Sequence, residues 1–507
     1  MSDIPNEVPV RAVIDRPPEA AGNRRQATGD GETDCHGRCA HRPRNDNPVG
    51  DGDLDAPLPA LTALARLRAA GFEASLVGGC VRDRLLGREP GDWDIATAAL
   101  PEQVEEVFAG ERLIETGLKH GTVTVLLDGM PLEITTFRTE SAYTDHRHPD
   151  AVRFTPSLTE DLARRDFTVN AMAWSPEAGL EDPFGGQADL AAAVIRCVGA
   201  PEQRFSEDAL RILRALRFAA QLSFSIDPST AAAAHALRGT LDLVSRERIA
   251  AELTKLLCGP DVCRVLTEYW EILAVPLPEL APMAGLDQRS AYHCYDVLTH
   301  CAVSASHVPP EKLLRWAALL HDVGKPATFT TDEAGRGHFH GHAAVSTELA
   351  REILTRLRFD KDTVRRVSAL VELHDYPIDP PVGNPERAIR RLLGRLGEED
   401  FFRLLALKRA DALAHHPDYR DRTAACDRIE ALARSLLAKK QCFSLKDLAV
   451  NGNDLLALGI PKGPAVGQAL NRLLDAVVSG ELANERQPLL DFLSEHERDR
   501  DKGSAFS

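Results

Sequence analysis

The chain has 507 residues, 44% of them hydrophobic, and a formal net charge of −16. A chain of this length is too long for one hydrophobic core and is predicted to form about three or four domains. It contains no apolar run of about 18 residues, which predicts no membrane span. The acidic balance argues against a protein that binds nucleic acid over its whole surface, although arginines cluster locally and a basic groove can coexist with an acidic whole.

The ten cysteines are scattered, most of them singly. In a chain of this size that pattern favours reduced thiols and a cytoplasmic location over a disulfide framework. The N-terminus also lacks the apolar core of a secretory signal.

Residues 1–55 are rich in Pro, Gly, Asp, Asn and Arg and lack hydrophobic periodicity, which predicts a disordered arm. Within it, Cys35, His36, Cys39 and His41 crowd together and could form a metal knuckle. Their spacing is too compressed for an ordinary zinc pattern and no core surrounds them, so a flexible tail is the favoured interpretation.

The most informative stretch follows a first predicted helix, Pro59–Ala70. An apolar run that ends at Val77 indicates a buried strand, and Gly78 and Gly79 come next, where backbone N–H groups can approach a phosphate. The stretch closes on Asp92 and Asp94, which a strand would project to the same face. Two like charges side by side favour a cation between them, so the pattern predicts metal-assisted nucleotidyl transfer.

A β-hairpin is predicted around Asp128-Gly129, between the strands Gly121–Leu127 and Pro131–Phe137. Glu133 on the second strand could supply a third carboxylate near the paired aspartates. A glutamate on a solvated strand face is the equally favoured alternative.

Other segments of the first half carry weaker signals. Pro101–Phe108 is predicted as a helix, and the polar stretch Arg138–Arg153 as a long loop, which is commonly functional at this length. Glu160–Trp174 begins as a predicted helix, and Asp182–Asp189 is a turn cluster that is either a hinge or a connection. The Glu160–Trp174 stretch brings four polar residues within about two turns: Arg164, Arg165, Asp166 and Asn170.

Ser206–Phe218 is predicted as one helix with Ser206 as its N-cap. One face carries both acids and guanidinium groups: Glu207, Asp208, Arg211, Arg214 and Arg217. Helical salt bridges alone would explain this pattern. In the sharper interpretation, Asp208 and Arg211 present hydrogen-bonding edges to a nucleobase. A second arginine-rich helix after Ser245, with Arg248 and Glu252, is interpreted as packing and capping.

The middle of the chain holds histidines and aspartates at the ends of apolar helices, a residue set that suits first-row divalent metals. This order resembles the HD-superfamily phosphohydrolases over roughly residues 290–415. The resemblance implies six ligands: His300, His321, Asp322, His342, His374 and Asp411. They would hold a divalent transition metal (Mn, Ni, Co or Fe) that activates water against a phosphoester. A fold kept only as a structural body is the alternative, and His338 and His340 match no ligand position.

The first half resembles the bacterial class II tRNA nucleotidyltransferases, or CCA-adding enzymes, and the related poly(A) polymerases. The resemblance rests on the glycine-aspartate stretch together with RRDFTVNAM, DPFGGQADL and EDALRILRALRF, from about residue 58 to 260. It continues near the C-terminus in LKDLAVNGNDLLALGIPKGPAVGQAL. There Gly459–Gly463 is either a phosphate-binding hairpin or a simple turn between packed helices.

The resemblance implies an α+β nucleotidyltransferase head of the polymerase β type with a mixed sheet, followed by an all-α neck, an HD body and a tail. The expected boundaries are arm 1–55, head 56–200, neck 201–265, HD body 266–425 and RNA-binding tail 426–507.

It also implies residue roles. Asp92 and Asp94 would be catalytic and hold Mg²⁺, DPFGG would be a spring element, and Tyr143–Pro149 would be a flexible loop that helps to switch specificity. The nucleotide would be bound by Gly78, Gly79, Arg82, Arg165, Asp166, Asn170, Glu207, Asp208, Arg211 and Arg214.

Three hypotheses follow. The first is a CTP(ATP):tRNA nucleotidyltransferase whose partners are tRNA, CTP and ATP. The second is an A-adding enzyme or poly(A) polymerase of the same family. The third, from another class, is a metal phosphohydrolase with an RNA-binding module. The sequence leaves a monomer or a homodimer open.

Overall fold

The computed structural model describes residues 54–117, 121–140, 152–378, 384–420, 422–438, 445–478 and 480–494. Residues 1–53 of the predicted arm, the Cys35–His41 cluster and the Tyr143–Pro149 loop lie outside these residues. Within them, no helix has both the length and the apolar character needed to cross a membrane.

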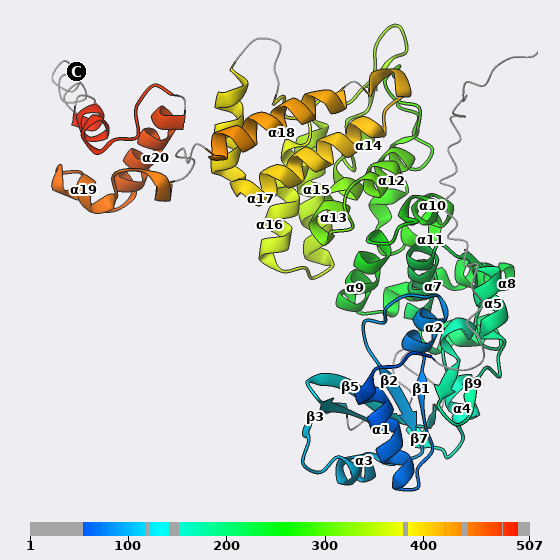
Figure 1. Ribbon diagram of the computed structural model, residues 1–507. Coiled ribbons are helices and arrows are strands. Elements are labelled where there is room, and N and C mark those ends of the chain that lie inside the picture. Colours follow the sequence, from blue (N-terminus) through cyan, green and yellow to red (C-terminus); the bar gives the residue numbers. More distant parts are fainter. Residues whose placement is uncertain are drawn as a thin grey trace, which may run out of the picture. The chain divides into compact units, whose positions relative to one another are not determined.

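The head is built on a seven-stranded sheet with the order β3-β4-β5-β2-β1-β8-β9 (Figure 1). β2 and β5 pair in parallel and the other neighbours are antiparallel, which confirms the predicted mixed sheet. The strands are β1 Ala74–Val77, β2 Asp94–Thr97, β3 Arg112–Gly117, β4 Thr122–Leu127, β5 Met130–Thr136, β8 Ala173–Ser175 and β9 Gly179–Glu181.

Local sequence explains several of these elements. The β4–β5 hairpin forms where it was predicted, because Asp128 and Gly129 both take the positive φ (49° and 81°) that a tight two-residue turn requires. Proline at the first turn starts helix α1 (Leu58–Ala69) and helix α3 (Pro101–Val107) near the predicted positions. Helix α2 (Gly79–Leu85) follows the glycine pair directly.

The stretch after the head loop is less helical than the sequence predicted. Helix α4 (Leu158–Ala163) is capped by the Ser157 hydroxyl and ends early. The chain then passes through the 3-10 turn η2 (Thr168–Asn170) into β8. In the predicted turn cluster, the Asp182 carboxylate accepts hydrogen bonds from the first backbone N–H groups of α5 (Gly186–Ala192).

The predicted single helix Ser206–Phe218 is wrong. Helix α6 (Pro201–Glu207) contains Ser206, so this serine is not an N-cap, and helix α7 (Leu210–Leu222) starts anew. Pro201 begins a helix earlier than expected. Asp208 then leaves the helical region (φ −137°, ψ 105°), and its Oδ1 accepts the Leu210 N–H at 3.0 Å. Glu207 and Arg211 therefore belong to different helices, although their side chains still meet.

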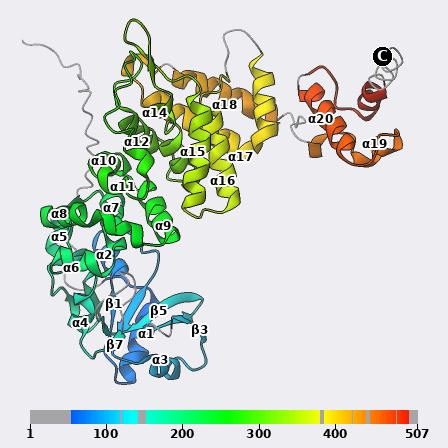
Figure 2. The same ribbon diagram turned by 180° about the vertical axis from the view of Figure 1, so that it is seen from behind.

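Beyond the head, helices form most of the described chain (Figures 1 and 2). The α-helices that follow α7 in this part are α8 Pro228–Leu237, α9 Arg246–Leu257, α10 Val262–Glu268, α11 Trp270–Leu273, α12 Val297–His307, α13 Lys312–Leu320, α14 Lys325–Thr328, α15 His342–Arg356, α16 Lys361–Leu373, α17 Pro385–Leu413 and α18 Arg422–Ala438. The short strands outside the main sheet and the other 3-10 helices are β6 Arg138–Glu140, β7 Val152–Phe154, β10 Val194–Ile195, β11 Ser225–Ile226, β12 Thr330–Thr331, β13 Gly337–His338, η3 Arg238–Leu243, η4 Pro278–Leu280, η5 Pro417–Tyr419 and η6 Leu445–Asp447.

The C-terminal helices α19 (Gly452–Ala457) and α20 (Pro464–Val478) have a hydrophobic cluster of their own, which includes Leu455, Leu473 and Leu489. It is separate from the main core. The predicted body–tail boundary at 425/426 lies inside α18, which packs along α17. The break between the two hydrophobic clusters falls after this helix.

Candidate active site in the head and a histidine–aspartate cluster

The paired carboxylates lie at the start of the central strand β2. Asp94 is its first residue and is half-buried, whereas Asp92 is exposed in the turn just before the strand. Trp93 and Ile95 are buried on the opposite side, as the predicted alternation requires. Burial, followed by the negative charges of Asp92 and Glu133, raises the pKa of Asp94 to about 6. A divalent cation bound between these carboxylates would stabilise the site by offsetting their repulsion.

Glu133 is the third acid at this position. It lies on β5 beside Asp94 in the parallel register, with its side chain exposed. Because its charge acts on Asp94, the register favours the third-carboxylate interpretation over a glutamate that faces only solvent.

Two arginines lie close to the β1–α2 turn, and Gly78 leaves the space for one of them. Gly78 has φ 79°, and a Cβ there would lie 2.7 Å from Arg165 Nη1. At Gly79 a Cβ would lie 3.6 Å from Arg82 Nη2. A side chain at Gly78 would therefore displace the Arg165 guanidinium as well as strain the backbone.

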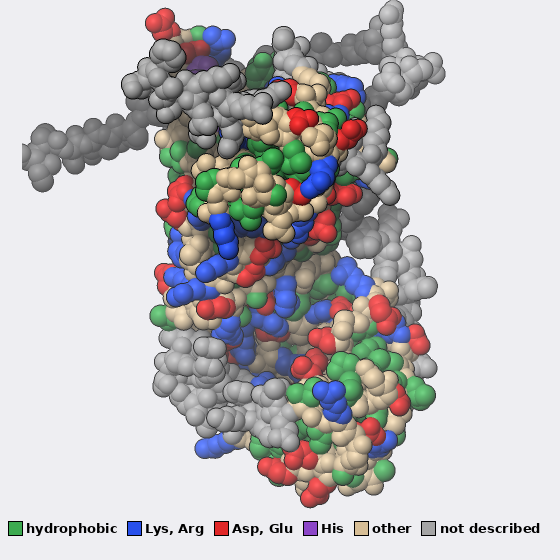
Figure 3. All heavy atoms as spheres, turned by 90° about the vertical axis from the view of Figure 1, so that its left-hand side faces the viewer, with side chains coloured by type: hydrophobic (Ala, Val, Ile, Leu, Met, Phe, Trp, Pro, Cys, Tyr) green, Lys and Arg blue, Asp and Glu red, His purple; other side chains and the backbone are tan. Residues whose placement is uncertain are grey.

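A chain of polar side chains links helix α2 to helix α7. Arg82 Nη1 donates to Asn170 Oδ1 at 2.6 Å, Asn170 Nδ2 donates to Asp166 Oδ1 at 3.1 Å, and Arg214 Nε donates to Asp166 Oδ2 at 2.7 Å. Burial alone would raise the pKa of Asp166, but Arg214, Asn170 and Arg211 hold it at about 2. The structure thus brings these predicted nucleotide-binding residues to one place. Figure 3 shows Lys and Arg side chains gathered across the middle of one face despite the acidic total.

The predicted base-reading residues are already engaged within the protein. Arg211 Nη1 donates to Glu207 Oε2 at 2.7 Å and Arg211 Nη2 donates to the Arg164 carbonyl at 3.1 Å. Asp208 Oδ2 accepts from Arg248 Nη2, on α9, at 2.8 Å. Sequence reasoning assigned Arg248 to packing and missed this contact, because the residues are 40 positions apart.

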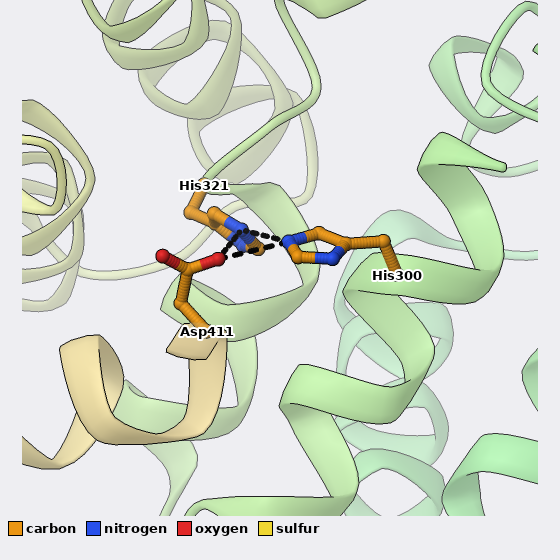
Figure 4. A group of neighbouring side chains, drawn as sticks. All are labelled: His300, His321 and Asp411. Carbon is orange, nitrogen blue, oxygen red and sulfur yellow. Dashed lines mark hydrogen bonds and ion pairs between the residues drawn. The ribbon is translucent and has the colours of Figure 1, made fainter. Parts of the chain in front are cut away.

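The second site collects all six predicted metal ligands from helices of the second half. His300 lies on α12 and Asp411 on α17, while His342 begins α15. The His321-Asp322 pair follows α13, and His374 follows α16. Figure 4 shows His300, His321 and Asp411 converging, with His300 Nε2 at 2.9 Å from Asp411 Oδ1.

The four histidines share one orientation. The Nδ1 atom of each faces a backbone carbonyl oxygen, at 3.3 Å for His300, 2.8 Å for His321, 2.9 Å for His342 and 2.7 Å for His374. Donation from Nδ1 leaves the Nε2 lone pairs facing inward. The Nε2 atoms of His300 and His321 are 3.3 Å apart, and those of His342 and His374 are 3.2 Å apart. Lone pairs at this distance repel each other unless a metal cation lies between them or one imidazole is protonated. Without a metal, burial would lower the pKa of His321, but the charge of Asp322 raises it well above its usual range.

Asp322 joins the two histidine pairs. Its Oδ2 lies 3.3 Å from His321 Nε2 and 3.5 Å from His300 Nε2, whereas its Oδ1 lies 3.4 Å from His342 Nε2 and 3.6 Å from His374 Nε2. Oδ1 is buried and has no hydrogen-bond partner within the described residues. This donor set would fit one or two divalent metal ions, and Asp322 lies within reach of both histidine pairs.

Lys325 is a cluster residue outside the predicted ligand set. The side chain is buried, and Nζ lies 2.7 Å from Asp322 Oδ2 and donates to Gln288 Oε1 at 2.8 Å. Burial would raise the pKa of Asp322, but His321 and Lys325 hold it well below its usual range.

Three family models match the chain. The poly A polymerase head domain matches residues 74–196, the probable RNA and SrmB-binding site of polymerase A matches 223–283, and the putative tRNA nucleotidyltransferase domain 2 matches 328–493.

Curated relatives match over most of their length. The CCA-adding enzyme of Streptococcus mutans is 36% identical over 86% of this chain and 96% of its own, and that of Geobacillus kaustophilus is 35% identical over 87% and 98%. A crystal structure of the Bacillus stearothermophilus CCA-adding enzyme in complex with CTP aligns with a TM-score of 0.66 and 32% identity, covering 88% of this chain and 98% of that one. The chain therefore belongs to the family of CCA-adding enzymes and is a tRNA nucleotidyltransferase.

Proposed function

We propose that this chain adds the 3′-terminal CCA of tRNA from CTP and ATP without a nucleic-acid template, and that the head carries the reaction. The observation that supports this most directly is the Asp92–Asp94 pair beside Arg165 and the Arg82–Asn170–Asp166 chain. The relatives above have the same activity in their names, and one was crystallised with CTP.

Each group has a role in this proposal. Asp92 and Asp94, with Glu133 beside them, would hold divalent ions, for which we propose Mg²⁺. When bound, these ions activate the 3′-hydroxyl and stabilise the leaving pyrophosphate. Arg82 and Arg165 would bind the triphosphate as bidentate donors.

The remaining polar residues would fix the sugar and the base. Asp166 and Asn170 would orient the ribose. Asp208 accepts hydrogen bonds and Arg211 donates them, so the two edges suit a nucleobase. Glu207 holds the Arg211 side chain and Arg248 holds the Asp208 side chain. The hydrogen-bonding groups that would contact the base are therefore oriented before it binds.

The test uses tRNA that lacks CCA, given CTP alone and then CTP with ATP. We expect CMP addition followed by AMP addition, with both lost in Asp92→Ala. Incorporation of ATP without any CTP incorporation would instead identify an A-adding enzyme or poly(A) polymerase. Unchanged addition by Asp92→Ala would exclude the proposed active site.

The histidine–aspartate cluster supports a second candidate function, a metal-dependent phosphohydrolase. The unpartnered Asp322 Oδ1 and the facing Nε2 atoms support it. We expect bound transition metal (Mn, Ni, Co or Fe) and hydrolysis of bis-p-nitrophenyl phosphate or a 2′,3′-cyclic phosphate. Both should be lost in His321→Ala and kept in the control His340→Ala, whose exposed side chain lies outside the cluster. If the protein bound no metal and hydrolysed neither substrate, the cluster would have only a structural role.

A further inference from the structure

Three arginine side chains of the head and neck gather against one phenylalanine ring. Phe218 lies on α7 and is 5% exposed. The guanidinium carbon of Arg217 lies 4.0 Å from the ring centroid, that of Arg82 5.0 Å, and that of Arg214 5.4 Å.

Like charges this close repel each other, so something must offset them. Each guanidinium has an acidic partner: Asp83 for Arg82, Asp166 for Arg214 and Glu252 for Arg217. The aromatic face adds an attraction that needs no negative charge, because its π electrons favour cations within about 6 Å. Burial, together with the charges of Arg214 and Arg82, lowers the pKa of Arg217 to about 10, which is consistent with this crowding.

The ring itself is fixed from the head side. Phe167 meets Phe218 edge to face, with centroids 5.7 Å apart and planes at 82°. The Phe167 N–H donates to Asp166 Oδ1 at 2.8 Å, so the same segment holds both the ring and the carboxylate that pairs with Arg214.

We propose that Phe218 is a positioning residue for the incoming nucleotide. Its ring holds the Arg82 guanidinium, which would bind the triphosphate, and the Arg214 guanidinium, which pairs with Asp166. The inference rests on the proposed nucleotide-binding role of these two arginines. It differs from an ordinary core role, in which the ring would contribute only buried apolar area. An aliphatic side chain of similar size would fill the same space, but it would leave the guanidinium groups without the π face.

The test compares Phe218→Leu with Phe218→Tyr. We expect Phe218→Leu to raise the KM for CTP and ATP by about tenfold, a loss typical of a desolvated cation–π contact, and to leave the KM for tRNA unchanged. Phe218→Tyr keeps the aromatic face and should restore the nucleotide KM. Phe218→Met replaces Phe218→Leu should the latter not fold.

The matched control is Phe108→Leu. Phe108 lies in the head and is fully buried. The guanidinium of Arg66 lies 5.8 Å from its ring centroid, but Arg66 is outside the nucleotide-binding set. Phe108→Leu should lower the melting temperature without changing the nucleotide KM. An equal change of the nucleotide KM in both leucine variants, or none in Phe218→Leu, would overturn the inference.

Arg82→Ala separates this inference from the proposed function. A raised nucleotide KM in Arg82→Ala with an unchanged one in Phe218→Leu would overturn the role of Phe218 alone. A wild-type nucleotide KM in Arg82→Ala would overturn the proposed triphosphate site, and the role of Phe218 with it.

Discussion

Asp94 shows how a single residue can cost stability in return for function. Its pKa of about 6 means that the fold prefers the protonated carboxyl, whereas metal binding needs the carboxylate. The raised pKa stabilises the metal-free fold below the unfolded pKa of about 4, and this contribution is lost as the pH rises through about 6. At neutral pH the charged carboxylate therefore opposes folding until a cation binds.

Asp94→Asn should accordingly stabilise the metal-free protein while abolishing nucleotide addition. We expect a gain of about 1 to 2 kcal/mol in the free energy of unfolding near pH 7.5, which disappears near pH 4. Urea unfolding in EDTA at both pH values measures it. Asp92→Asn is the control and should gain less, because Asp92 is exposed. A loss of stability in Asp94→Asn at neutral pH would contradict the burial argument.

Glu133 allows a second prediction at the scale of one residue. If it completes a set of three carboxylates with Asp92 and Asp94, Glu133→Gln should raise the Mg²⁺ concentration needed for half-maximal CMP addition by about tenfold. Glu102→Gln, on the exposed first turn of α3, should leave the Mg²⁺ dependence unchanged. A normal Mg²⁺ dependence in Glu133→Gln would assign Glu133 to the solvated strand face.

At the scale of elements, the sequence predicted those features that depend on neighbouring residues in the chain. The Asp128-Gly129 turn fixed the hairpin, and helix-ending His-Asp pairs indicated a metal-like cluster, whose six members the resemblance to HD phosphohydrolases implied. The break between α6 and α7 was not predictable from spacing, because Glu207 and Arg211 stand four residues apart, as in one continuous helix, although they belong to different helices. The Asp208–Arg248 contact could not be predicted from the sequence either, because it depends on how α9 packs against α7.

The Asp208–Arg248 pair leads to a prediction about nucleotide selection. Arg248 holds the carboxylate that we propose reads the base, so Arg248→Ala should free Asp208 to rotate. We expect the preference for CTP and ATP over UTP and GTP to fall by about tenfold in kcat/KM, comparable with the loss of one base contact. Arg246→Ala is the control on the same helix, because Arg246 pairs with the exposed Asp242. Equal selectivity in the two variants would show that Arg248 only braces the helices.

At the scale of the whole molecule, the net charge and the separate C-terminal hydrophobic cluster bear on where tRNA binds. The net charge of −16 disfavours broad RNA binding, so contacts to tRNA phosphates must come from local groups of Lys and Arg (Figure 3). The C-terminal helices have a hydrophobic cluster separate from the main core, so they can be removed without opening that core. This part is predicted to bind RNA.

A chain that ends at Ala438, the last residue of α18, tests this division. We expect it to keep the melting transition of the main core and the wild-type KM for CTP, because the head and its polar chain are intact. The KM for tRNA should rise by about tenfold or more, and it should depend less steeply on salt, since each phosphate contact that is lost removes its share of counterion release. Lys462→Ala in the full chain is the point variant, because Lys462 lies between the positive-φ residues Gly459 and Gly463 that join α19 to α20. If the shortened chain bound tRNA with an unchanged salt dependence, the phosphate contacts would have to lie on the head, neck and body, and the glycine segment would be a turn that only connects two packed helices.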